Sequence, residues 1–147
     1  MKEKQYNRVI LMADDDADDR FLVKEAFQEI GENHQIYLVE NGEQLMDYLE
    51  KRNAFTPENA PLPDLLLLDI NMPKKNGIEV LREIRENRKL SSIPIVVLST
   101  SNSEEDILRS YELGANSFIT KPIGFDQLVE SLKNLNTYWF ETVSLPK

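Results

Sequence analysis

The sequence predicts an α/β fold in which helices cover both faces of one parallel sheet. Three short apolar runs with polar boundaries, Val9–Ala13, Leu65–Leu68 and 95–98, are typical of strands buried on both sides. Two weaker runs, 36–39 and Ser117–Thr120, are rich in β-branched and aromatic residues. Helical patterns separate these runs, and such alternation implies right-handed crossovers and a parallel sheet. We therefore expect a single doubly wound domain of the flavodoxin-like class, with strand order 2-1-3-4-5.

Four of the predicted helices begin at a polar residue or a glycine that suits a helix start. In chain order the starts are Asp16, Asn41, Asn76 or Gly77, and Ser103, the last with Asp106 in capping-box spacing. Gly31 and Gly114 are the expected ends of the first and fourth helices. The apolar faces are Leu22, Val23, Ala26, Phe27 and Ile30; Ile78, Leu81 and Ile84, with Arg82, Glu83 and Arg85 outward; Ile107, Leu108 and Tyr111; and Leu128, Leu132 and Leu135.

Composition excludes several classes of protein. The 147 residues include 17 Lys and Arg against 26 Asp and Glu, a net charge of −9, and no Cys. Disulfide scaffolds and cysteine-based zinc sites are thereby excluded. The pI of about 4.7 argues against a dedicated nucleic-acid binder, which needs a basic field or face. The apolar runs are far shorter than the roughly 20 residues of a bilayer span, and the polar N-terminus does not look like an export signal, so we expect a cytoplasmic protein.

Two segments stand outside the regular alternation. Residues 52–63 form a long loop punctuated by proline, and residues 137–147 carry unusual apolar weight for a tail. Tyr138, Trp139 and Phe140 in that tail either fold back on the core or contribute to a dimer or partner surface. We expect the single histidine, His34, to be exposed in a loop.

Acidic and basic residues follow the predicted strands directly. In an open parallel sheet, ligands bind at the carboxyl ends of the strands. Asp14 and Asp15 follow the first strand, Asp69 the third, Ser99 the fourth and Lys121 the fifth. The first and third strands are neighbours in the predicted order, so we expect the carboxylates to converge, with Ser99 and Lys121 across from them.

This set of residues suits phosphoryl transfer assisted by a metal. Carboxylates held together repel one another unless a cation is present, and oxygen donors without His or thiolate select a hard ion such as Mg²⁺. A metal beside an ammonium and a hydroxyl supplies the positioning and charge stabilisation that phosphoryl transfer needs. Asp69 is the favoured nucleophile, because it alone lies between the metal-side acids and Lys121, and the product would be an aspartyl phosphate.

These motifs together resemble the response-regulator receiver domains of two-component signalling. The resemblance covers roughly residues 8–136 and is more specific than any single motif. It rests on Ala13-Asp14-Asp15, the segment from Asp64 to Pro73 followed by Gly77, the segment from Pro94 to Thr100, Gly114-Ala115, and Lys121-Pro122.

The resemblance implies a role for each acidic residue of the site. Asp15 would bind Mg²⁺ directly, Asp14 through water and Asn71 through its backbone carbonyl, while Asp69 would be both ligand and phosphoacceptor. Lys121 would contact the phosphoryl oxygens, and the peptide bond that follows it would be cis.

The resemblance also implies a switch. Ser99 would move toward the phosphoryl group and Phe118 would turn inward, reshaping the face formed by the fourth helix, fifth strand and fifth helix. Ser99 stands where Thr is commoner, and Thr100 is larger than the usual residue, which would crowd access of the phosphodonor. Asn71 and Ser101 occupy the positions that tune dephosphorylation.

A narrower resemblance is to the small regulators that partner cyanobacterial phytochrome kinases. It rests on the loop 52–63, the turn 73–77 and the apolar tail segment 143–146. The expected protein is a stand-alone switch, not an enzyme, with 137–147 as an extension and no output domain. Its expected phosphodonor is a sensor histidine kinase, such as a phytochrome-like kinase, or a phosphotransfer protein. The other expected partners are a downstream protein and a second copy in a homodimer.

The same residues give weaker support to other functions. A flavodoxin-like cofactor binder needs a phosphate-binding loop after the first strand, where acids would repel the phosphate of FMN. An aspartyl-phosphate hydrolase needs an acid at position 71, which is Asn71. An EF-hand formed by Asp14, Asp16, Asp18 and Glu25 would need Gly at Asp19 and a helix in place of the preceding strand.

Overall fold

Strands and helices alternate along the chain and form one parallel sheet. The computed structural model describes residues 8–31 and 34–142. Within them the sheet has the order β2-β1-β3-β4-β5 and every pairing is parallel, as the sequence predicts. The elements are β1 (Val9–Ala13), α1 (Ala17–Ile30), β2 (Gln35–Val39), α2 (Gly42–Glu50), β3 (Leu65–Leu68), α3 (Gly77–Glu86), β4 (Ile95–Ser99), α4 (Glu104–Glu112), β5 (Ser117–Thr120), α5 (Phe125–Asn136) and the π-helical turn η1 (Thr137–Thr142).

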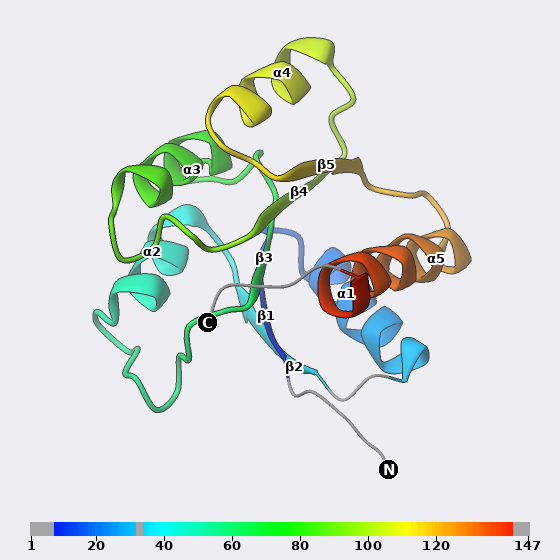
Figure 1. Ribbon diagram of the computed structural model, residues 1–147, viewed down its shortest axis with the longest axis horizontal. Helices are drawn as coiled ribbons and strands as arrows, with labels where there is room; N and C mark the ends of the chain where they lie inside the picture. The colour runs from blue at the N-terminus through cyan, green and yellow to red at the C-terminus, as the bar shows by residue number, and fades with distance from the viewer. Residues whose placement is uncertain (1–7, 32–33, 143–147) are drawn as a thin grey trace.

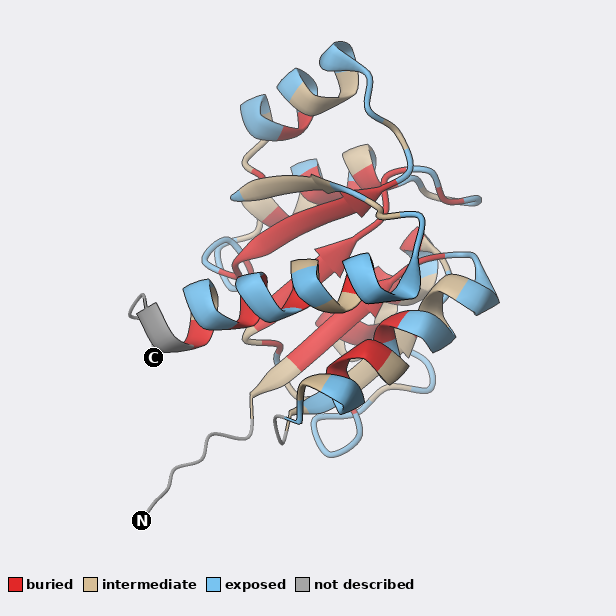
Figure 2. Ribbon diagram, turned by 90° about the vertical axis from the view of Figure 1, so that its right-hand side faces the viewer, coloured by how far each residue is buried: buried red, intermediate tan, exposed pale blue. Residues whose placement is uncertain are grey.

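The sheet separates two apolar layers. Helices α1 and α5 lie side by side on one face, while α2 and α3 cover the other, with α4 beyond α3 at the β5 edge (Figure 1). The central strands are buried on both faces, and the edge strands β2 and β5 only partly (Figure 2). This difference explains why the central strands have continuous apolar runs and the edge strands weaker ones.

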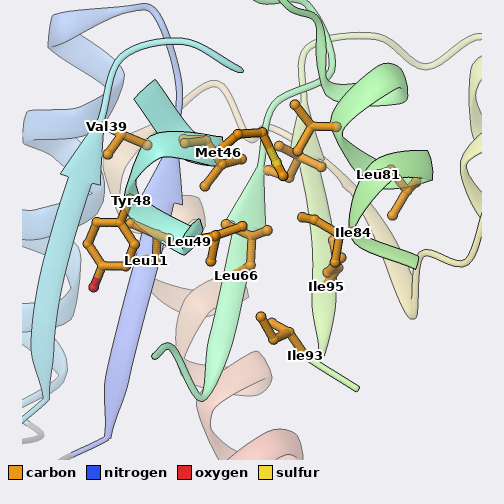
Figure 3. Close-up of a cluster of buried hydrophobic side chains, with 14 of the residues drawn as sticks. Leu11, Val39, Met46, Tyr48, Leu49, Leu66, Leu81, Ile84, Ile93 and Ile95 are labelled. Atoms are coloured by element: carbon orange, nitrogen blue, oxygen red, sulfur yellow. The ribbon is translucent and has the colours of Figure 1, made fainter. Parts of the chain in front are cut away.

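Apolar side chains of the sheet fill the layer beneath α2 and α3. Figure 3 shows Leu66 between Leu49 of α2 and Ile84 of α3, with Leu11 on the other side of Leu49. The ring of Tyr48 is buried in the same layer, and its hydroxyl donates a 2.7 Å hydrogen bond to the carbonyl oxygen of Pro61. This bond attaches the proline-rich loop 52–63 to the domain.

Side-chain caps start the helices where the sequence predicts them. Asp16 accepts from the backbone N–H groups of Asp18 and Asp19, and Asn41 accepts from that of Gln44. The reciprocal capping box forms at Asn76. At Ser103 only half of the expected box forms, because the Asp106 carboxylate accepts from the Ser101 hydroxyl at 2.6 Å.

His34 is half-buried, not exposed as expected. Its ring lies 5.0 Å from that of Phe140 and 6.5 Å from that of Phe27, and its Nε2 donates to Oδ1 of Asn136 at 2.6 Å. The cause is tertiary, since η1 extends α5 and brings Phe140 into the α1–α5 core. Tyr138 of the same turn is 52% exposed. The tail segment 143–146 lies outside the described residues.

Three helix faces also differ from expectation, the first through Leu22 of α1, which is 38% exposed. Arg85 of α3 is partly buried and donates to the carbonyl oxygens of Gly114, Ser91 and Ile93, so it is not an outward residue. Leu108 and Tyr111, expected on the inner face of α4, are exposed. Among the helices of residues 8–31 and 34–142, none combines the length and apolar composition needed to cross a bilayer.

Candidate functional site

The ends of β1 and β3 bring acidic side chains together. Ala13 is in register with Leu68, and the next residues, Asp14 and Asp69, follow directly. Asp14 is fully buried, Asp69 is 6% exposed, and Asp15 is exposed at the rim. One carboxylate oxygen from each of Asp14, Asp15 and Asp69 lies within 4.8 Å of the others. The predicted acidic cluster is thus present.

A glycine shapes the turn that carries Asp69. A Cβ atom at Gly77 would lie 2.5 Å from the carbonyl oxygen of Asp69 and 2.6 Å from Cα of Ile70. Without that atom, the Gly77 N–H donates to the Ile70 carbonyl at 3.0 Å. The turn is also held by the Asn71 N–H, which donates to Asp69 Oδ1 at 3.2 Å. Any side chain at Gly77 would displace the backbone that positions Asp69.

Lys121 reaches the cluster from the end of β5. Its Nζ lies 2.6 Å from Asp14 Oδ2 and 3.6 Å from Asp69 Oδ2. Its backbone N–H donates to the Ser99 carbonyl at 2.7 Å, which joins the ends of β4 and β5. The peptide bond from Lys121 to Pro122 is trans, since no peptide bond of the described residues is cis, and the expected cis bond is therefore wrong for this structure. The two isomers before proline differ by only about 0.5–1 kcal/mol in unfolded chains, so sequence alone does not decide between them.

One site residue was not expected from the sequence. Asp19, predicted to be only a first-turn acid of α1, lies with Oδ2 2.7 Å from Lys121 Nζ. Side chains in a helix tilt toward its N-terminus, and α1 begins at the edge where Asp14 lies. Asp18 shares this tilt but is exposed, so the tilt alone does not distinguish Asp19 in the sequence.

Burial opposes charge on the acids. Burial raises the pKa of Asp14 to about 6, against the hydrogen bond with Lys121, which lowers it. Burial also raises the pKa of Asp69, and the charge of Lys121 opposes that rise. For Lys121 burial favours the neutral amine, but the bonds to Asp14 and Asp19 outweigh it and raise the pKa. The positive charge of Lys121 therefore does not fully offset the burial of the two acids, and a bound cation would supply further positive charge beside them.

Comparison with known proteins identifies the family of this fold. The family model of the response regulator receiver domain matches residues 10–133. The chain belongs to the response-regulator receiver family. It is a receiver-domain response regulator and not a classical enzyme, and its acidic pocket fits a phosphoacceptor site with a metal. The flavodoxin-like and hydrolase alternatives have no support in these matches.

Phytochrome response regulators are among the similar proteins. Response regulator Rcp1 of Synechocystis is 40% identical over 139 residues, which cover 95% of this chain and 93% of Rcp1. The phosphorylated cyanobacterial phytochrome response regulator RcpA is 39% identical with a TM-score of 0.89, over 97% of this chain and all of that one. The Mn²⁺-bound form of Rcp1 has a TM-score of 0.86 at 39% identity, over 95% of this chain and 99% of Rcp1. Receiver domains of this kind partner with sensor histidine kinases.

The structure also places the expected metal ligands and the two residues expected to form the switch, Ser99 and Phe118. The oxygen donors of Asp14, Asp15 and Asp69 fit a hard divalent cation. Ser99 is buried, and its Oγ accepts from the Ser101 N–H at 3.2 Å. Phe118 is partly buried, packs against the α2–α3 layer, and donates its N–H to the Tyr111 hydroxyl at 3.0 Å.

Proposed function

We propose that Asp69 accepts a phosphoryl group from the phosphohistidine of a sensor histidine kinase. This assignment rests on which carboxylate oxygens of the site already have a hydrogen-bond or ion-pair partner. Both oxygens of Asp14 are engaged, Oδ1 by the Asp16 N–H at 2.9 Å and Oδ2 by Lys121. Oδ2 of Asp69 lies 3.6 Å from Lys121, beyond an ordinary hydrogen bond, and is the oxygen left to attack phosphorus. The P–N bond of the donor then breaks, and its electron pair returns to the imidazole.

The cation of the site would be Mg²⁺, bound directly by Asp15 and Asp69, through water by Asp14, and by the backbone carbonyl of Asn71. When bound, it supplies positive charge to the oxygens of the transferring group. The chain's own part is to aim the Asp69 carboxylate through the Asn71 N–H and to present the Lys121 ammonium. Both act on charge that develops in the transition state, where fixed donors are most effective.

Phosphorylation changes the face formed by α4, β5 and α5. Ser99 turns from the Ser101 amide toward the phosphoryl oxygens, and Phe118 moves into the vacated space. Leu108 and Tyr111 on α4 are exposed apolar groups that suit a downstream protein. Asn71 and Ser101 tune dephosphorylation, which the domain assists itself.

The partner class follows from the relatives rather than from the site. We propose a phytochrome-like kinase or a phosphotransfer protein as the donor, with residues 8–136 as the receiver unit and 137–147 as its extension. Output is by contact with a downstream protein, with a homodimer as one form of the protein, in the cytoplasm.

Phosphorylation by a small donor tests the acceptor. The purified chain is incubated with acetyl phosphate and Mg²⁺, and the product is measured by intact mass with and without hydroxylamine, which cleaves acyl phosphates. We expect one hydroxylamine-labile phosphoryl group in the native chain and none in Asp69→Asn. Asp16→Asn, which keeps a capping side chain and lies outside the cluster, should be labelled normally. A labile phosphoryl group on Asp69→Asn would show that the acceptor is another residue.

A further inference from the structure

We propose that Asp19 is a positioning residue that holds the Lys121 ammonium at the acceptor when a divalent cation occupies the Asp14, Asp15 and Asp69 cluster. This inference rests on the proposed function of Asp69. Asp19 belongs to α1 and Lys121 to the segment after β5, so the pair connects two elements that are far apart in the sequence.

Three carboxylates compete for one ammonium. Nζ of Lys121 lies 2.6 Å from Asp14, 2.7 Å from Asp19 and 3.6 Å from Asp69. The Lys121 side chain is only 10% exposed, so these acids, and not water, supply most of its polar surroundings. The position of the Lys121 ammonium thus depends on which of these three acids attract it.

A cation weakens the hold of Asp14 on Lys121. Asp14 belongs to the cluster of potential ligands, so a bound ion draws on its charge and also repels the ammonium beside it. Asp19 is not among the ligand atoms of that cluster. Its 2.7 Å contact with Lys121 therefore does not compete with ligation of a bound ion, and Asp19 remains an anchor for Lys121 outside the cluster.

Anchoring by Asp19 leaves the ammonium free to act. An ammonium has three N–H donors, and Asp14 and Asp19 engage at most two of them. Nζ lies 3.6 Å from Asp69 Oδ2, beyond an ordinary hydrogen bond, so the third donor remains for an oxygen of a phosphoryl group carried on Asp69. Lys121 therefore needs no release from Asp19 to bind the phosphoryl group, and the pair reduces the rotamer freedom that a long lysine side chain would otherwise keep.

The structure supplies a matched control in the same helical turn. Asp18 is also an acid of the first turn of α1, but it is exposed, and its backbone N–H donates to the Asp16 carboxylate. Asp18→Asn removes the same charge near the site without touching Lys121. Asp19→Glu restores a carboxylate of greater reach and tests whether the charge is what matters.

The experiment compares phosphorylation rate with metal affinity in the full chain. Rate constants for acetyl phosphate are measured at saturating Mg²⁺ by intact mass, and Mg²⁺ affinity by calorimetry without the donor. We expect Asp19→Asn to be slower by about 3- to 10-fold, Asp18→Asn to stay within about twofold of native, and Asp19→Glu to recover at least half the loss. Metal affinity should differ by less than about twofold between Asp19→Asn and Asp18→Asn, since neither residue is a ligand.

Each alternative outcome is informative. If Asp19→Asn and Asp18→Asn react equally, or if Asp19→Asn reacts faster than native, Asp19 does not position Lys121 and the inference is wrong. A parallel loss of metal affinity in Asp19→Asn alone would also overturn it, because Asp19 would then act on the cluster. If the native chain itself is not phosphorylated on Asp69, the proposed function fails, which is a distinct result.

Discussion

Replacing Asp14 by Asn should make the metal-free protein more stable. Asp14 is completely buried at the end of β1, yet with a pKa of about 6 it is mostly charged at neutral pH. Its position suits a metal ligand and disfavours the apo fold, because burial raises its pKa despite the nearby ammonium of Lys121. Asn keeps the size and hydrogen-bonding shape of the side chain and removes the charge.

The magnitude follows from the pKa of Asp14. A rise from 3.8 to about 6 disfavours the charged form of the folded protein by about 3 kcal/mol at pH 7. The folded pKa is above the unfolded one, so this group lowers the free energy of unfolding as pH rises from about 4 to 6. The penalty is then constant at higher pH, and it is absent below about pH 4. We expect Asp14→Asn to gain about 2–3 kcal/mol at pH 7.5.

Urea unfolding followed by circular dichroism measures this gain. The protein is held in a chelator at pH 7.5 and at steps down to pH 4. Asp16→Asn is the control, since it removes an equal charge from an exposed position and keeps a good helix cap. The gain of Asp14→Asn over this control should shrink steadily toward pH 4.

Two results would refute the reasoning about Asp14. The first is an Asp14→Asn protein no more stable than Asp16→Asn at pH 7.5. The second is a gain that stays constant down to pH 4, which would show that charge is not its origin. Either result would show that the buried charge of Asp14 does not destabilise the metal-free fold.

Three further predictions concern the site and the core. Asp14 has a pKa of about 6, so protons compete with Mg²⁺ for this site below pH 6. The Mg²⁺ dissociation constant measured by calorimetry should therefore rise by up to about tenfold per pH unit below pH 6 and stay level between pH 7 and 8. An affinity that stays level down to pH 5 would contradict this. Gly77→Ala should lower the free energy of unfolding in urea by about 1–3 kcal/mol, because its Cβ atom would meet backbone atoms. Gly124→Ala, whose Cβ would have nothing within 4 Å, should lower it by less than about 1 kcal/mol. Equal losses would refute the packing argument. In the same assay, Phe140→Ala should lower the free energy of unfolding by about 3 kcal/mol, because Phe140 is buried, and Tyr138→Ala by less than about 1 kcal/mol, because Tyr138 is exposed. Equal losses would show that η1 does not contribute to the core.

Local signals account for what the sequence predicted well. The side-chain caps at Asp16 and Asn41 involve residues only two or three positions apart, so they are visible in the sequence. Asp14 and Asp69 could be placed together because parallel strands share a carboxyl edge, and the strand order then makes β1 and β3 neighbours. The acidic cluster is therefore a consequence of order and register, both of which leave a pattern in the chain.

Contacts between distant segments left no such pattern. His34 looked like a loop residue until η1 brought Phe140 to within 5.0 Å of its ring. Arg85 looked like a solvated residue of α3, but its guanidinium donates to the loop carbonyls of Gly114 and Ile93. In both cases the partner lies far along the chain or in an irregular segment, where hydrophobic periodicity gives no information.

The sequence by itself determined the α/β class, the sheet order and the residues of the acidic cluster, because alternating patterns and strand ends are local properties. Only the tertiary structure decided the environment of Lys121. Three acids surround its ammonium, and one of them, Asp19, comes from a helix that the sequence presented as carrying only capping charges. The reason is physical: the direction of a side chain and the burial of a charge depend on how helices pack against the sheet, and these set the electrostatics of the site.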